Sequence, residues 1–87
     1  MYYVYVLFEQ RNRRFYVGYT HHLRRRLQEH EQGQVASTAG RTPLELAYYE
    51  AAVNREDALH REKYLKTTYG KRYIRSRLRR YLAAKGK

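Results

Sequence analysis

The chain has 87 residues and carries 19 Lys and Arg against 8 Asp and Glu, a formal net charge of +11. It contains no cysteine, which excludes disulfide staples and thiolate metal sites and fits a reducing compartment. No apolar run approaches the ~20 residues that span a membrane, and the N-terminus lacks the pattern of a secretion signal. We therefore expect one small cytoplasmic domain over residues 1–87, near the lower size limit for a chain that folds on its own core.

The basic charge is combined with eleven tyrosines and no tryptophan. Arg is more frequent than Lys, and its planar guanidinium suits phosphate oxygens. Basic side chains interleaved with aromatic rings are typical of nucleic-acid-binding proteins. The alternatives are a surface that is basic without a specific partner, or a protein held near the ribosome by bulk charge. We expect nucleic acid as the partner, with DNA ahead of RNA, and no membrane.

The first third of the sequence predicts a β-hairpin. Residues 2–8 and 14–19 are rich in β-branched and aromatic side chains, and the polar stretch 9–14 is typical of a hairpin connection. The apolar first run indicates a strand buried on both faces. Such a hairpin can bring the phenols of Tyr5 and Tyr16 onto one face. A buried phenol needs a partner for its hydroxyl, so the pair indicates a polar site as well as a core.

The middle of the chain predicts a helix, a loop and a third strand. Gly18 within the second strand suggests close approach of another backbone or a ligand. Thr20 is placed as a helix N-cap, and Gly33 is placed to end that helix and start a small, polar loop over residues 33–42. The side chains expected to face inward recur at helical spacing before the loop and alternate after Pro43: Leu23, Leu27 and His30, then Leu44, Leu46 and Tyr48.

The last third predicts two helices. Asn54 can cap the first, which has an acidic first turn, and Gly70 is placed to end it. A basic helix follows over about residues 70–83. The expected inner stripes are Ala58, Leu59, Leu65 and Tyr69, then Tyr73, Ile74, Leu78, Tyr81 and Leu82. The order β-β-α-β-α-α predicts an α+β domain in which helices flank a small three-stranded antiparallel or mixed sheet.

Two positions stand out as candidates for chemistry in the helices. Arg26 lies at the edge of the apolar stripe of the first helix, and His30 lies one turn further on the same face. The alternative is that Arg26 is solvated charge and His30 a boundary residue. Glu62 interrupts the inner stripe of the second helix, where a carboxylate needs a compensating partner. It can form a structural bridge with Arg26 or hold a magnesium ion that keeps most of its waters, and both readings stay open.

Other catalytic signatures are missing from the sequence, including a Gly-rich phosphate loop, a Ser-His-Asp set and paired carboxylates. His21, His22 and His60 lack the spacing of a transition-metal site. What remains is a tyrosine, arginine and single-carboxylate set. It can support phosphodiester hydrolysis, since a phenol can handle the proton of water and an arginine can neutralise phosphate oxygens.

The ordered motifs resemble the GIY-YIG endonuclease superfamily, over about residues 2–82. The resemblance is carried by Tyr3-Val4-Tyr5, by Tyr16-Val17-Gly18, and by the runs that hold Arg26 and Glu62. It is closest to the small stand-alone bacterial members, which are similar to the nuclease modules of excision-repair and structure-selective endonucleases. The resemblance implies that the catalytic residues are Tyr5, Tyr16, Arg26, His30 and Glu62. It also implies that Glu62 binds a single divalent metal ion, Mg²⁺ or Mn²⁺.

Substrate contacts are expected around this set. The resemblance implies that Gly18 lets DNA approach the strand and that Tyr19 stands where some relatives carry Lys. The full set of candidate substrate-binding residues is Gly18, Tyr19, Arg24, Lys66, Lys71, Arg72 and Arg75. From residue 71 onward the chain has eight basic residues and no acid, which favours a surface that follows a nucleic-acid backbone over a merely solvated helix face.

One departure from the family pattern concerns the C-terminal helix, where many relatives carry an Asn that completes the site. Here the asparagines are Asn12 and Asn54, and Ser76 is the candidate for the equivalent place. We expect a metal-dependent DNA endonuclease that is selective for structure rather than sequence and acts in DNA repair or recombination. The alternatives are a catalytically weak or inactive nucleic-acid-binding module and an RNA-directed protein. A protein partner and the oligomeric state are left open.

Overall fold

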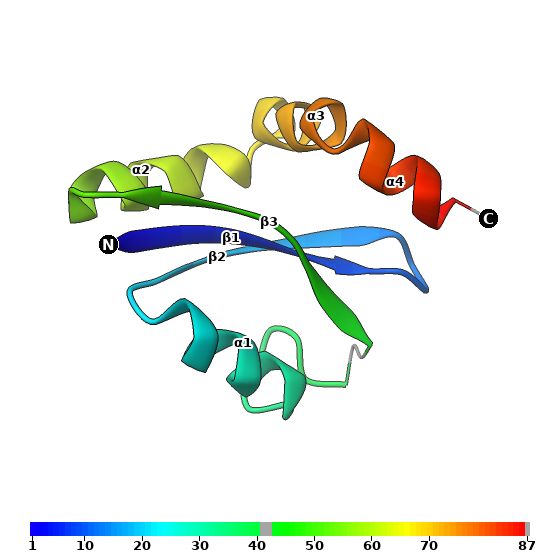
Figure 1. The fold of residues 1–87 in the computed structure, drawn as a ribbon, viewed down its shortest axis with the longest axis horizontal. Helices are drawn as coiled ribbons and strands as arrows, with labels where there is room; N and C mark the ends of the chain where they lie inside the picture. Colours follow the sequence, from blue (N-terminus) through cyan, green and yellow to red (C-terminus); the bar gives the residue numbers. More distant parts are fainter. Residues whose placement is uncertain (41–42, 87) are drawn as a thin grey trace.

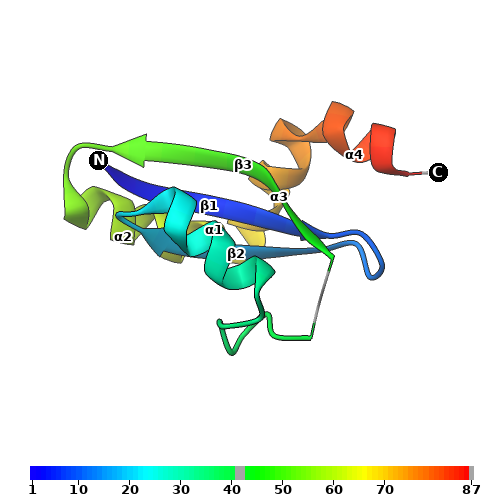
Figure 2. The ribbon, with the colours of Figure 1, turned by 60° about the horizontal axis from the view of Figure 1, so that its bottom comes forward.

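The sheet is antiparallel and its first strand is the central one. The structure, a computed structural model, describes residues 1–40 and 43–86. The elements of these residues are β1 (Tyr2–Glu9), β2 (Arg14–Thr20), α1 (Leu23–Glu31), β3 (Leu44–Ala52), α2 (Arg55–Leu65), α3 (Thr68–Arg77) and α4 (Arg79–Lys85). The strand order is β2-β1-β3, and α1 covers one face of the sheet while α2, α3 and α4 cover the other (Figures 1 and 2). The expected α+β class with a three-stranded, helix-flanked sheet is confirmed.

The strand β1 is buried on both faces, as its apolar sequence predicts. Val4 and Val6 pack in the core against residues of α2 and α3, including Leu65 and Ile74. Side chains alternate across a strand, so the odd-numbered residues of β1 face α1 instead. Among these, Tyr5 is only 2% exposed. A tyrosine of the central strand is thereby fixed between the sheet and α1.

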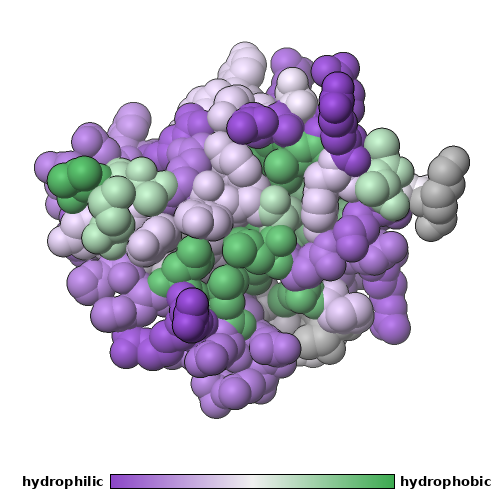
Figure 3. Space-filling view, viewed as in Figure 1, coloured by the Kyte–Doolittle hydropathy of each residue, from purple (hydrophilic) through white to green (hydrophobic). Residues whose placement is uncertain are grey.

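The strand β3 contains a bulge that changes which of its residues face the core. Val6 pairs with Tyr48 but Leu7 pairs with Leu46, so Ala47 is the extra residue. The expected alternation of Leu44, Leu46 and Tyr48 along one face is therefore wrong. Tyr48 packs against the core beneath α2 and α3, whereas the two leucines face α1 and line a depression beside it. Apolar surface is visible where β3 passes α1 (Figure 3).

The helix ends follow the sequence signals in some places and not in others. Asn54 caps α2, accepting a hydrogen bond from the N–H of Asp57 at 3.1 Å, as expected. Gly33 follows α1 with a φ of +73°, which suits its role as the helix stop. Thr20 is not an N-cap, because it ends β2 and its hydroxyl accepts from the N–H of His22 at 3.0 Å. The N-cap position of α1 is His22, without a side-chain capping bond.

Gly70 lies inside a helix and does not end one. The helix α2 ends at Leu65, and Thr67 caps α3 by accepting a hydrogen bond from the N–H of Gly70 at 3.1 Å. A Cβ atom at position 70 would overlap the carbonyl oxygen of Tyr64 and the Cα of Leu65. Glycine is needed here because the first turn of α3 presses on the end of α2, which is a tertiary constraint.

Two further differences follow from this junction. Tyr69, expected in an inner stripe, is 70% exposed. The basic helix expected over about residues 70–83 is two helices, α3 and α4, which meet at Leu78. Every helix within residues 1–40 and 43–86 is too short and too polar to cross a bilayer.

We expect Gly70→Ala to lower the free energy of unfolding by about 1–3 kcal/mol, the usual range for overpacking. This is opposite in sign to the gain that alanine normally gives inside a helix. Urea unfolding monitored by circular dichroism measures the change. Ser76→Ala, on an exposed position of the same helix, is the control and is expected to leave stability unchanged or slightly higher. A Gly70→Ala variant as stable as the wild type would contradict the proposed close packing of α3 on α2.

Candidate active site

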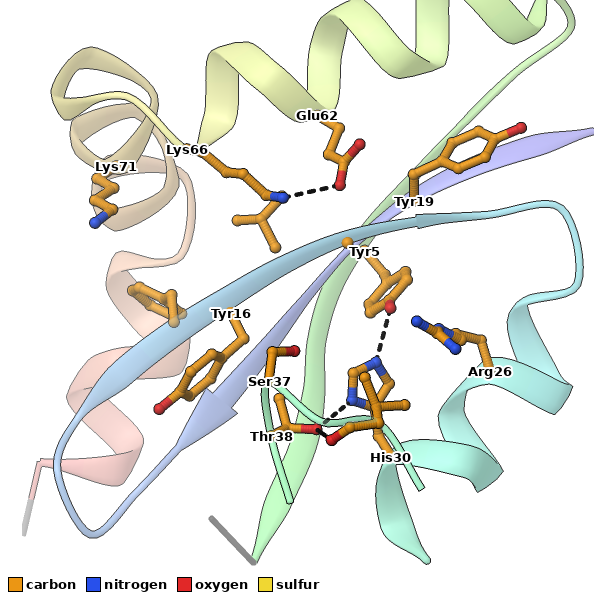
Figure 4. Close-up of a pocket in the computed structure, with 14 residues that line it drawn as sticks. Tyr5, Tyr16, Tyr19, Arg26, His30, Ser37, Thr38, Glu62, Lys66 and Lys71 are labelled. Atoms are coloured by element: carbon orange, nitrogen blue, oxygen red, sulfur yellow. Dashed lines mark hydrogen bonds and ion pairs between the residues drawn. The ribbon is translucent and has the colours of Figure 1, made fainter. Parts of the chain in front are cut away.

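A cavity of about 390 Å³ lies at the edge strand β2. Its walls come from β1, β2, α1, the loop after α1, α2 and α3 (Figure 4). The five residues expected to be catalytic all line it: Tyr5, Tyr16, Arg26, His30 and Glu62. The cavity extends around the edge strand, so α1 contributes side chains from one face of the sheet and α2 and α3 from the other. The fold thus gathers residues from distant parts of the sequence around one space.

Tyr5 reaches this cavity because the residue beside it on β2 is Gly18. The two residues are directly opposite each other in the antiparallel pair. A Cβ atom at position 18 would overlap the ring and hydroxyl of Tyr5. The glycine therefore makes room for the phenol of Tyr5 across the edge strand. The close approach expected at Gly18 exists, but it is made by a tyrosine ring and not by another backbone.

The hydroxyl of Tyr5 meets two residues of α1. It lies 2.7 Å from Nε2 of His30, and the guanidinium of Arg26 points at the same oxygen (Figure 4). Burial raises the pKa of Tyr5, and the positive charge of Arg26 opposes this rise without cancelling it. The phenol is therefore protonated at rest, with a cation placed to stabilise its negative charge if it loses the proton.

His30 is a buried residue of this site and not a boundary residue. Its Nδ1 lies 2.6 Å from Oγ1 of Thr38, which is 1% exposed and belongs to the loop after α1. Burial lowers the pKa of His30, and the neighbouring Arg26 lowers it further. The imidazole is therefore neutral near pH 7. Thr38 was not predicted as a site residue from the sequence, because a lone threonine in a small, polar loop belongs to no motif and to no regular pattern.

Glu62 faces the cavity from α2, on the other side of β2 from Arg26 (Figure 4). Its side chain is 21% exposed, and its Oε2 lies 3.0 Å from Nζ of Lys66, one turn later. Arg26 pairs instead with Glu29 at 3.0 Å. The structural bridge between Arg26 and Glu62, one of the two readings of the sequence, is absent. Glu62 is therefore a cavity carboxylate whose present partner is a flexible lysine.

The donor set at Glu62 fits a hard divalent cation that keeps most of its waters. Within the described residues, 1–40 and 43–86, no group of three or more His, Cys, Asp and Glu side chains is gathered in one place. This part of the chain therefore does not provide enough ligands to surround a fully dehydrated ion. Mg²⁺ is commonly bound by one or two carboxylates, waters and substrate phosphates, and one partly exposed carboxylate in a cavity is compatible with that.

Tyr16 lines the same cavity, but its hydroxyl is directed away from Tyr5 (Figure 4). It donates a hydrogen bond to Oε1 of Glu9 at 3.2 Å. The two phenols share one face of the hairpin, as expected, yet only Tyr5 contacts both Arg26 and His30. The hydroxyls of Tyr5 and Tyr16 therefore have different partners.

The candidate substrate-binding residues are distributed around the cavity and beyond it. Gly18, Tyr19, Lys66 and Lys71 line it. Arg75 of α3 lies over the ring of Phe15, which also lines it, while Arg72 lies over the exposed ring of Tyr69. Two residues lie elsewhere. Arg24 borders a separate groove at the start of α1, and Ser76 borders a depression between α3 and α4. The α3 residue that faces the cavity is Lys71, so Ser76 does not complete the site.

Comparison with known proteins identifies this arrangement. The model of the GIY-YIG catalytic domain matches residues 1–75. The chain belongs to the GIY-YIG family. It is similar to a UPF0213 protein of Oceanobacillus iheyensis, at 42% identity over 65 residues that make up 74% of each chain. A UPF0213 protein of Haloquadratum walsbyi is 41% identical over 66 residues, 75% of this chain and 73% of the relative. No solved structure gives a significant match.

The family assignment confirms the resemblance found in the motifs. A GIY-YIG domain is a nuclease domain, so the chain has a nuclease fold whose substrate is nucleic acid, and nucleases of this family generally use a divalent metal ion. The match covers β1 to most of α3, which contain every residue that lines the cavity. The matched domain and the cavity are therefore the same part of the molecule.

We expect Gly18→Ala to displace the Tyr5 ring and to lower the free energy of unfolding by about 1–3 kcal/mol, as for other overpacked sites. In the Tyr5→Leu background the same alanine should be better tolerated, because the shorter side chain vacates the space beside position 18. A double-mutant cycle by urea unfolding measures this coupling. Additive effects of the two substitutions would show that Gly18 is not required by the Tyr5 ring.

Proposed function

We propose that this GIY-YIG domain is a metal-dependent DNA endonuclease that recognises the structure rather than the sequence of its substrate and acts in DNA repair or recombination. The observation that carries the proposal is the convergence of Tyr5, Arg26 and Glu62 on one cavity at the β2 edge. These side chains supply a proton carrier, a fixed positive charge and a metal-binding oxygen, which are the groups that phosphodiester hydrolysis needs.

Each residue has a distinct role in this reaction. Tyr5 takes a proton from the attacking water, and Arg26 neutralises the charge that develops on the phosphate oxygens. Glu62 would hold the divalent cation, Mg²⁺ or Mn²⁺, from α2. When bound there, the cation supplies charge that stabilises the leaving oxygen. Tyr16 and Tyr19 are placed to border the substrate.

Lys66 gives Glu62 a countercharge in the absence of other cations. An exposed lysine pair of this kind contributes little to stability, so it yields easily to a stronger ligand. We propose that Lys66 then turns toward a substrate phosphate, in line with its expected place among the substrate-binding residues. Lys71 faces the cavity from α3 and is suited to the same contact.

The basic face of α3 and α4 supports a substrate with a phosphate backbone. Among the described residues, the arginines of these helices have no carboxylate within ion-pair distance: Arg72, Arg75, Arg77, Arg79 and Arg80. Unpaired arginines contact phosphates regardless of sequence, and phosphate contacts position a protein without reading bases. This favours recognition of backbone shape. The absence of cysteine fits a reducing compartment such as the cytoplasm.

A second candidate function is a nucleic-acid-binding module with the same fold and little or no turnover. The position of Ser76 outside the cavity favours it, because the hydrogen-bonding residue expected from the C-terminal helix is then missing from the site. Metal-dependent cleavage separates the two functions, since both need the basic surface and only one needs Glu62.

We expect the protein to cut branched or flapped DNA faster than plain duplex in the presence of Mg²⁺ or Mn²⁺. Glu62→Gln keeps the shape of the side chain but removes its charge, and should lower the cleavage rate at least about 100-fold, as should Arg26→Ala. A gel assay with labelled flap, branched, duplex and single-stranded DNA, and with matched RNA, measures this.

Glu56→Gln is the control, because Glu56 is an exposed carboxylate on the same helix as Glu62. It should cut like the wild type. If the wild type cuts no substrate with either metal, or if Glu62→Gln cuts equally well, the nuclease proposal is wrong. Binding without cleavage would support the module, and preferential cutting of RNA would overturn the choice of DNA.

We expect Lys71→Gln and Arg75→Gln to weaken DNA binding and to reduce its salt dependence. Each lost phosphate contact should lower the slope of log K against log salt by about 0.9 for duplex DNA. Fluorescence anisotropy over a range of salt concentrations measures the slope. Arg55→Gln is the matched control, since Arg55 lies at the start of α2 and is paired with Glu56. A slope in both α3 variants equal to that of the wild type would place the DNA elsewhere.

A further inference from the structure

Three buried side chains that line the cavity form a chain of polar contacts. The Tyr5 hydroxyl lies 2.7 Å from Nε2 of His30, and Nδ1 of His30 lies 2.6 Å from Oγ1 of Thr38. Oγ1 of Thr38 lies 3.5 Å from the carbonyl oxygen of Val35. Tyr5, His30 and Thr38 are at most 5% exposed. The three side chains are therefore paired mainly with one another, and the Tyr5 hydroxyl also borders the cavity.

The direction of these hydrogen bonds follows from the groups at the two ends. At one end, Arg26 can only donate to the Tyr5 oxygen, so the phenol proton needs another acceptor. Among the described residues, Nε2 of His30 is the acceptor within hydrogen-bonding distance of that hydroxyl. At the other end, the Val35 carbonyl can only accept, which suits a proton donated by Thr38.

One arrangement gives every donor an acceptor. Thr38 donates to the Val35 carbonyl, the N–H at Nδ1 of His30 donates to Thr38, and Tyr5 donates to Nε2. In the reverse arrangement Thr38 donates to Nδ1 and His30 donates from Nε2 to Tyr5. The Tyr5 proton must then turn into the cavity beside a guanidinium, with no acceptor in the described part of the protein. The first arrangement is preferred because it gives every donor an acceptor within the protein, whereas in the reverse arrangement the Tyr5 proton depends on water in the cavity.

We propose that Thr38 is a positioning residue that holds His30 in the tautomer protonated at Nδ1, so that Nε2 can take the proton of Tyr5 during hydrolysis. The inference rests on the nuclease function proposed above and adds two residues to it. His30 is the proton acceptor behind Tyr5. Thr38 touches neither substrate nor metal and acts only through His30.

The proton balance of this step is complete. The oxygen of the attacking water forms a bond to phosphorus, and its proton passes to the Tyr5 oxygen. The original Tyr5 proton passes to Nε2 of His30, which becomes an imidazolium that donates through both nitrogens, to Tyr5 and to Thr38. The bond between phosphorus and the leaving oxygen breaks, and that oxygen takes a proton from solvent. His30 returns its proton to solvent through Tyr5, favoured by the adjacent charge of Arg26.

The tautomer can be read directly by NMR. Long-range ¹H–¹⁵N spectra distinguish a protonated from an unprotonated ring nitrogen, and His30→Gln assigns the His30 signals among the four histidines. At pH 7.5 the wild type should show a protonated Nδ1 and an unprotonated Nε2. A protonated Nε2 in the wild type would overturn the proposal, whether or not the protein cuts DNA.

Matched substitutions test the role of Thr38. Thr38→Val keeps the shape but removes the hydroxyl, and Thr38→Ser restores it. Valine should shift the NMR signals toward the Nε2-protonated tautomer and lower kcat at least about 10-fold, since a general base contributes about 10²–10⁴, with KM for DNA nearly unchanged. Serine should restore both the tautomer and kcat. A valine variant with wild-type signals and kcat would overturn the proposal, as would a serine variant no better than valine.

The two proposals fail separately. If the wild type cuts no DNA, the nuclease proposal fails, while the NMR result still decides the tautomer. If it cuts DNA and Thr38→Val does not fold, the wild-type spectrum together with the tautomer and kcat of Thr38→Ser decides the role of Thr38. A protein that cuts DNA with its His30 protonated at Nε2 retains the nuclease function and loses the relay.

Discussion

The packing of one tyrosine ring over one glycine determines the rest of the site. Tyr5 belongs to the central strand, and a side chain at such a position would normally lie between the sheet and α1. Because Gly18 has no side chain, the phenol extends across β2 to the edge of the sheet. Arg26 and His30 meet it from one side and Glu62 faces the same cavity from the other. This contact places the phenol beside both halves of the site, which lie on the two sides of β2.

Charge is arranged around that phenol in two layers. Close to it lie a fixed guanidinium and a neutral, buried imidazole, whose pKa is held down by burial and by Arg26. Further out lie Lys71 and the arginines of α3 and α4, which have no carboxylate partner among the described residues. In the proposed function the inner layer prepares a proton transfer, and the outer layer attracts a polyanion. Arg26 pairs with Glu29 and Glu62 pairs with Lys66, so Arg26 and Glu62 do not neutralise each other.

The sequence predicted those parts of the structure that depend on local chemistry. The strands, the Asn54 cap and the Gly33 stop follow from side chains acting within a few residues. The five catalytic candidates taken from the family motifs all line one cavity, and their catalytic roles stay predictions. The sequence did not predict features that depend on contacts between distant segments. Gly70 is set by α3 pressing on α2, and Thr38 matters only because its loop returns beneath His30.

The bulge in β3 and the place of Tyr16 belong to the same group of missed features. The extra residue, Ala47, cannot be recognised from the regular alternation of the sequence. It nevertheless places Tyr48 on the face of the sheet opposite to that of Leu44 and Leu46. Tyr16 belongs to a motif as strong as that of Tyr5, but its hydroxyl donates a hydrogen bond to Glu9. Motif strength identifies the family, whereas the neighbour of each hydroxyl decides what that residue can do.

The central position of β1 also has a consequence for the growing polypeptide. The strand β1 is covered on both edges by β2 and β3 and on both faces by helices, and all of these segments follow it in the chain. Tyr5 is therefore synthesised long before Glu62, and the nascent chain holds a phenol without its carboxylate. The cavity that holds Tyr5 and Glu62 can therefore form only after the chain has been synthesised through α2 and the start of α3.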